Sequence, residues 1–354
     1  MAKRWNPGHY WYAFNGATRD GRLYTTSWDR IKSNSNFKGV QIAVWWSTHE
    51  TSKGVYDFSG LVSDLATINS YGKKCVIRLM DRSFHGYDRG NPLPAYIDSE
   101  YDGEWADDTH GEDIVAPKMW LPEVTERWCL FIEACIAATK DAGSGCVEAY
   151  FTEECSYSGA YQLGSAIGYT IAGQNAALLK IAQRGAAAVG TNGPQFWMNM
   201  GWSNEDINNF TEHYRMTDEI VRTRRCGIGP TDLQSDSNES TYTEGNSYGQ
   251  YIYDRYAGEA VFPICHEYIS YMNAPTPGDL INYAYDLGIH YVMWEDLDYT
   301  TGYGGRTNTD AINAVNSSSG KINSAKPANI VYFDGSRIVA DLAALTGGSS
   351  SAVA

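Results

Sequence analysis

The chain has 354 residues, of which 43% are hydrophobic and 19% charged, so it is long enough and apolar enough to bury a sizeable core. Its formal net charge of −15 argues against nucleic acid or an anionic membrane as a partner, because both would require a basic patch. No apolar run approaches the length of a membrane span, and the N-terminus lacks the apolar core of a signal sequence.

The seven cysteines indicate neither a disulfide framework nor a zinc site. Their number is odd, most lie in or beside predicted strands, and no pair has the CxxC spacing. We expect buried free thiols, which favours a reducing compartment or release without a classical signal. No acidic loop has the spacing of a calcium site, and we expect neither a metal nor a cofactor.

Strands and helices alternate along the chain. Runs rich in β-branched and aromatic residues predict eight strands, at residues 10–15, 39–46, 74–80, 147–155, 195–200, 227–232, 261–267 and 290–295. Apolar residues at helical spacing predict helices between them, near residues 28–31, 61–68, 122–142, 169–188, 206–224 and 279–287. This alternation is typical of a parallel sheet, and eight such units predict an α/β protein with a closed (β/α)8 barrel, the TIM barrel.

The predicted domain organisation is one barrel, residues 1–315, followed by a C-terminal extension, residues 316–354. The alternation degrades after Ile312, residues 317–320 read as a linker, and residues 347–354 as a flexible tail. Within the barrel, the connection from Asp81 to Leu121 is long, and loops of that length in a compact domain usually carry function.

Acidic residues stand at the ends of two predicted strands. Glu153 and Glu154 end the fourth strand and Glu267 ends the seventh. The catalytic groups of such barrels lie at the C-terminal ends of strands. Two carboxyl groups beside a glycosidic bond are what glycoside hydrolysis requires. One is held protonated to donate to the leaving oxygen, and the other is ionised to attack the anomeric carbon or activate water.

The other strand ends supply candidate substrate-binding residues. We expect Arg78 to make a salt bridge and also to hold the attacking carboxylate, Glu267, ionised, since a cation lowers a carboxylate pKa. Trp45 and Trp46 face opposite sides of their strand, so at most one reaches the site. The remaining candidates are Asn15, Asn199 and Trp294 at strand ends and His85 in the long connection.

Residues 45–60 read W-W-S-T-H-E-T-S-K-G-V-Y-D-F-S-G. This run resembles the strand-two region of retaining β-glycosidases in the large (β/α)8 clan that includes glycoside hydrolase families 5, 35 and 42. The resemblance covers roughly residues 10–300. It implies an acid/base Glu at the end of strand four, a nucleophilic Glu at Glu267, and a Trp294 that stacks under the bound sugar. The chain departs from the clan's pattern where strand four ends Glu153-Glu154 in place of Asn-Glu.

Side-chain alternation favours Glu154 as the acid/base. If Glu154 points into the barrel, Glu148 and Tyr150 do so too, and no charge lies in the apolar layer under the helices. Glu153 then occupies the place of the clan's Asn, although a β-bulge would reverse this parity. The same rule, with Arg78 and Asn199 inward, places residues 75, 77, 79, 196 and 198 against the helices.

The leading hypothesis is a retaining β-glycoside hydrolase that acts on an oligo- or polysaccharide. A catalytically silent, carbohydrate-binding barrel is the first alternative, because the Asn-Glu motif is missing. A polysaccharide lyase is the second. It would need positive charge to hold an acidic sugar, and a chain at −15 supplies little.

Overall fold

The computed structural model describes residues 3–12, 22–83, 90–107, 114–153, 164–199, 216, 219–223, 226–229, 263–266, 276–286, 288–296 and 307–327. Four of the predicted site residues, Asn15, His85, Glu154 and Glu267, lie outside these ranges. Their placement therefore stays a prediction.

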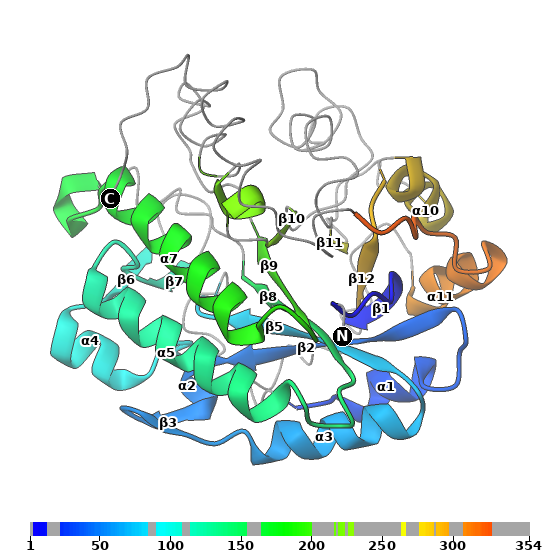
Figure 1. Cartoon of the computed structure of the whole chain (residues 1–354), viewed down its shortest axis with the longest axis horizontal. Coiled ribbons are helices and arrows are strands. Elements are labelled where there is room, and N and C mark those ends of the chain that lie inside the picture. Colours follow the sequence, from blue (N-terminus) through cyan, green and yellow to red (C-terminus); the bar gives the residue numbers. More distant parts are fainter. Residues whose placement is uncertain are drawn as a thin grey trace.

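Eight parallel strands form one curved sheet (Figure 1). The strands are β1 (Gly8–Tyr12), β2 (Phe37–Trp45), β5 (Lys74–Met80), β8 (Val147–Thr152), β9 (Gln195–Asn199), β10 (Gly227–Gly229), β11 (Pro263–His266) and β12 (Tyr291–Glu295). Their order is β10-β9-β8-β5-β2-β1-β12-β11, and the two edge strands, β10 and β11, approach each other. The predicted (β/α)8 barrel is confirmed.

Helices surround the outer face of this sheet (Figure 1). They are α1 (Thr25–Ile31), α2 (Trp46–His49), α3 (Ser59–Ser70), α4 (Ala95–Tyr101), α5 (Pro122–Thr139), α7 (Ile171–Val189), α10 (Pro277–Asp286) and α11 (Asn308–Ser317), with a 3-10 turn at Gly164–Ile167 and a π-helical turn at Glu219–Thr223. Local chemistry marks several starts. Pro122 opens α5, and the Thr170 hydroxyl accepts a hydrogen bond from the Gly173 N–H at the start of α7. None of the described helices is long and apolar enough to cross a membrane.

Two expectations about loops are corrected. Trp46 was expected to end the second strand, but it begins α2. The connection from Asp81 to Leu121 was expected to be one long loop. It contains α4 and a hairpin of β6 (Glu104–Asp107) and β7 (Ile114–Pro117). A second hairpin, β3 (Glu50–Ser52) with β4 (Val55–Tyr56), follows α2.

Apolar side chains form two layers, one inside the barrel and one between sheet and helices. The interior cluster consists of Tyr10, Val76, Ala149, Phe151, Trp197, Tyr291 and Met293. The outer cluster contains Cys75, Ile77, Leu79, Phe196 and Met198 among many others. The alternation expected for β5 and β9 is therefore confirmed. Five cysteines, Cys75, Cys129, Cys135, Cys146 and Cys226, are buried free thiols as expected, and the side chains of the other two lie outside the described residues.

Strand β8 contains a bulge that the alternation argument did not include. Val147 pairs with Cys75 and Ala149 with Val76, so Glu148 is an extra residue in the ladder. Beyond it, Ala149 points into the barrel, whereas Tyr150 points to the helices. The alternation predicted for this strand, with Tyr150 inward, is wrong for residues 149–152, because the bulge reverses it. Glu154 itself lies outside the described residues.

The Glu148 carboxylate lies inside the barrel at the end where the strands begin, which we call the lower end. It accepts hydrogen bonds from the backbone N–H and the amide of Asn6, both at 2.8 Å, and from the Tyr291 hydroxyl at 2.7 Å. Gln195 donates a fourth bond at 3.3 Å. A buried charge is tolerated only with such compensation. Burial raises the pKa of Tyr291 well above its ordinary value, and the neighbouring Glu148 raises it further.

The described part of the C-terminal extension packs on the same end of the barrel. The boundary expected at residues 315/316 falls inside α11, which ends at Ser317. The next residues contact the barrel through the Lys321 carbonyl, which is 3.1 Å from His9 Nε2, and the Ser324 carbonyl, which accepts from Trp5 Nε1 at 3.0 Å. Residues 321–326 therefore pack against β1 and the N-terminal segment before it.

Candidate active site

An ion pair joins two neighbouring strands at their C-terminal ends. Arg78, near the end of β5, contacts Glu153, which directly follows β8, through Nη2 and Oε1. The two side chains are only 6% and 1% exposed. Opposite charges in contact attract strongly where water is excluded, so the guanidinium stabilises negative charge on Glu153. The salt bridge expected for Arg78 is confirmed, and its partner is Glu153.

An aromatic residue of β1 contacts the cation of this pair. The Arg78 guanidinium lies over the ring of Tyr12, with Cζ 5.3 Å from the ring centroid. Tyr12, Ala43, Trp45 and Met80 form a buried cluster at this end of the barrel. The sequence argument missed Tyr12, because it looked for the site residue of the first strand at Asn15. Alternation from the inward Tyr10 would have found it.

Trp46 does not reach the site. Its Nε1 donates to Glu50 Oε2 at 2.6 Å, and its ring packs against Trp128 of α5, with centroids 4.9 Å apart. The expectation that at most one of the two tryptophans faces the barrel is confirmed, and the inward one is Trp45.

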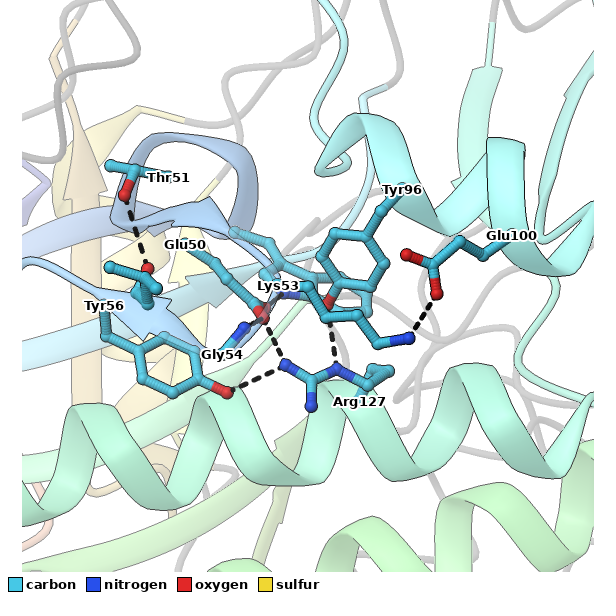
Figure 2. Close-up of polar contacts among 10 residues, drawn as sticks. Glu50, Thr51, Lys53, Gly54, Tyr56, Tyr96, Glu100 and Arg127 are labelled. Atoms are coloured by element: carbon cyan, nitrogen blue, oxygen red, sulfur yellow. Dashed lines mark hydrogen bonds and ion pairs between the residues drawn. The ribbon is translucent and has the colours of Figure 1, made fainter.

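Much of the run shared with the β-glycosidases has a structural role here. Glu50 is buried and binds Arg127 of α5, and Figure 2 shows this ion pair beside the turn of the β3–β4 hairpin. Glu50 Oε1 also accepts the Gly54 N–H at 2.7 Å, while Arg127 donates to the hydroxyls of Tyr96 at 3.0 Å and Tyr56 at 3.2 Å (Figure 2). These contacts fasten the hairpin to α4 and α5, outside the barrel.

Asn199 ends β9, the strand beside β8. It is fully buried, and its backbone N–H donates to the Thr152 hydroxyl at 3.0 Å. Since Trp197 points into the barrel, alternation places the Asn199 side chain inward as well. Arg78, Glu153 and Asn199 therefore lie at the same end of three adjacent strands.

The position expected for Trp294 is wrong. Tyr291 and Met293 of the same strand belong to the interior cluster, so Trp294 points outward into the layer under the helices. Its Nε1 donates to His9 Nδ1 at 2.9 Å, and the side chain is almost completely buried. It cannot stack under a sugar bound inside the barrel.

A small hollow adjoins Glu153. Asp81, Arg82, Thr152 and Glu153 line its polar side, and its apolar side consists of Met119, Trp128, Leu178, Ile181 and Met198. Asp81 and Arg82 form a buried two-pronged ion pair, with both contacts at 2.9 Å. The sequence argument named neither residue. Across the described ranges, no three His, Cys, Asp or Glu side chains are grouped so that they could hold a metal ion.

These features define a (β/α)8 barrel with a buried ion pair at the C-terminal end of its strands. No protein-family model and no curated protein matches the sequence. Similar solved structures include the catalytic domain of a β-amylase from Paenibacillus polymyxa, with 12% identity, a TM-score of 0.58, and coverage of 92% of this chain and 100% of that one.

Two further similar structures carry the same fold. A β-1,4-D-mannanase from Cryptopygus antarcticus has 10% identity and a TM-score of 0.53, covering 93% of this chain and 96% of its own. A β-galactosidase from the psychrophilic Marinomonas ef1 has 12% identity and a TM-score of 0.51, covering 80% of this chain and 55% of its own. At these identities the likeness establishes the shared barrel.

Proposed function

We propose that the protein is a glycoside hydrolase that cleaves β-glycosidic bonds of an oligo- or polysaccharide with retention of configuration. The observation that carries this proposal is the buried Arg78–Glu153 pair at the catalytic end of the barrel. Support for a glycoside hydrolase in general comes from the three similar structures, a β-amylase, a β-galactosidase and a β-1,4-D-mannanase.

The ion pair suggests how the acidic residues divide their roles. Arg78 already engages the Glu153 carboxyl in a buried ion pair. We assign proton donation to the next residue, Glu154, and nucleophilic attack to Glu267, which directly follows β11. Glu153 is then a fixed anion beside the reacting groups, in the place where the clan has Asn.

The reaction has two steps. The Glu267 carboxylate attacks the anomeric carbon while Glu154 transfers its proton to the leaving oxygen, which gives a glycosyl-enzyme ester and the free alcohol. Glu154, now ionised, takes a proton from water as the water oxygen attacks the same carbon. The ester bond breaks, which frees Glu267 and leaves a sugar of the original configuration.

A screen over aryl β-glycosides and polysaccharides, with product analysis by NMR, tests the proposal. Glu267→Gln abolishes turnover. Glu154→Gln abolishes cleavage of unactivated glycosides. It retains part of the activity on dinitrophenyl glycosides, because their leaving group needs no proton. Added azide restores the activity on these dinitrophenyl glycosides. Glu153→Gln is the matched variant. If it shows the leaving-group dependence and Glu154→Gln does not, the proton donor is Glu153. Full activity of Glu267→Gln refutes the mechanism.

A carbohydrate-binding barrel without catalysis remains the second candidate. It is favoured by the same ion pair, which occupies Glu153 with Arg78. Glycan binding without turnover across the screen would support it. The lyase is disfavoured further, because Arg78 and Arg82 both contact carboxylates and offer little net positive charge to an acidic sugar.

A further inference from the structure

We propose that Tyr12 is a positioning residue that acts through Arg78. Its ring holds the Arg78 guanidinium in the one orientation from which Arg78 fixes the Glu153 carboxylate. The Arg78 guanidinium lies over the aromatic face of Tyr12, with Cζ 5.3 Å from the ring centroid, and its Nη2 binds Glu153. The kinetic part of this inference rests on the proposed function.

The contact is made across an intervening strand. In the sheet, β2 lies between β1, which carries Tyr12, and β5, which carries Arg78. The β2 residue paired with Arg78 is Ala43. Because Ala43 has only a methyl group, it leaves space above β2 through which the guanidinium reaches the ring. A larger side chain at this inward position would occupy that space.

The environment makes the contact strong. Counted as whole residues, backbone included, Tyr12, Arg78 and Glu153 expose only 5%, 5% and 3% of their surface. A cation–π contact is worth most when water is excluded from both partners. The ring itself is held by Ala43, Trp45 and Met80, which form one buried cluster with it. An arginine side chain has several rotatable bonds, so a fixed ring on one face limits the orientations open to the guanidinium.

The groups that surround Glu153 come from several elements of the barrel. Arg78 comes from β5, and Asp81 and Arg82, from the segment after β5, contact each other. Strand β9 presents Asn199, which carries no charge, and the lining residues of α5 and α7 are apolar. Arg78 forms a buried ion pair with Glu153, so its orientation affects where the carboxylate lies.

Two variants of Tyr12 test the aromatic face. Tyr12→Phe keeps this face, and Tyr12→Leu replaces it with a smaller aliphatic side chain. The first readout is independent of activity: hydrogen exchange of the Arg78 Nε–H in ¹⁵N-arginine-labelled protein, with the signal assigned by its loss in Arg78→Lys. We expect Tyr12→Phe to match the wild type within about twofold and Tyr12→Leu to exchange about tenfold faster. Ala43→Val, which narrows the space over β2, accelerates exchange in the same way.

The second readout is hydrolysis of the best aryl glycoside from the screen. Tyr12→Leu lowers kcat about tenfold with KM changed less, and Tyr12→Phe restores it. Unchanged exchange in both Tyr12→Leu and Ala43→Val overturns the proposal, as does a Tyr12→Phe variant as impaired as Tyr12→Leu. If Tyr12→Leu does not fold, Ala43→Val decides alone. Faster exchange in a protein whose wild type hydrolyses no glycoside supports the role of Tyr12 and refutes the proposed function.

Discussion

Burial of His9 in its neutral form makes the fold sensitive to acid. His9 lies on β1 with no exposed surface, and its Nδ1 accepts from Trp294 Nε1 at 2.9 Å. Its Nε2 is 3.1 Å from the Lys321 carbonyl, which can only accept, so Nε2 carries the proton. A second proton on Nδ1 would face the indole N–H. The pKa of His9 is lowered from 6.5 to about 4, chiefly by burial; the hydrogen bond to the Lys321 carbonyl opposes this shift, and the charge of Lys38 contributes to it.

The size of the effect follows from this pKa difference. Because the folded-state pKa lies below the unfolded value, the stabilisation is fully present above about pH 6.5 and is lost as pH falls from 6.5 towards 4. Between pH 7 and pH 5, His9 alone lowers the free energy of unfolding by about 2 kcal/mol. Below pH 4 the loss reaches about 3 kcal/mol.

Urea unfolding at pH 7 and pH 5 measures this loss. Carboxylates also titrate in acid, so the informative quantity is the difference between wild type and His9→Gln, which keeps a donor and an acceptor but does not titrate. From pH 7 to pH 5, the free energy of unfolding of the variant is expected to fall by about 2 kcal/mol less than that of the wild type, whatever the stability of the variant at pH 7. His290, whose pKa burial also lowers to about 4, gives the matched comparison in His290→Gln. An identical pH dependence in wild type and His9→Gln would refute the reasoning.

Three further outcomes are expected. Glu148→Ala removes the acceptor of three donors, the Asn6 N–H, the Asn6 amide and the Tyr291 hydroxyl, whereas Gln195 keeps its bond to the Arg4 carbonyl. The free energy of unfolding in urea should fall by about 3–5 kcal/mol, and a loss below about 1 kcal/mol would contradict the network. Gly185→Ala should lower the free energy of unfolding by about 1–3 kcal/mol, because a Cβ there would lie 2.3 Å from the Phe196 ring. Gln183→Ala, at an exposed position of the same helix, should leave it unchanged. Trp294→Phe should lower stability by about 1 kcal/mol through its lost hydrogen bond and leave KM for glycosides within about twofold, whereas a large rise in KM would indicate sugar stacking after all.

The sequence was sufficient for the barrel and for part of its site. Strand β5 was predicted with its observed bounds, Lys74–Met80, because its residues are strong strand formers between turn residues. The rule that parallel strands present their C-terminal ends at one edge then brought Arg78 and Asn199 together without any contact being known. Both inferences use only neighbours along the chain, and period-two alternation holds within a regular strand.

Only the tertiary structure decided which side chains face the site. The bulge at Glu148 arises where β8 pairs with Cys75 and Val76, more than 70 residues earlier in the chain, and it turned Glu153 inward. The inward face of β12, and with it the outward position of Trp294, likewise depends on pairing between distant strands. Composition and periodicity thus determine that a strand forms and where it lies in the order. Its register against its neighbours determines which face meets the barrel interior, and a shift by one residue exchanges the two faces.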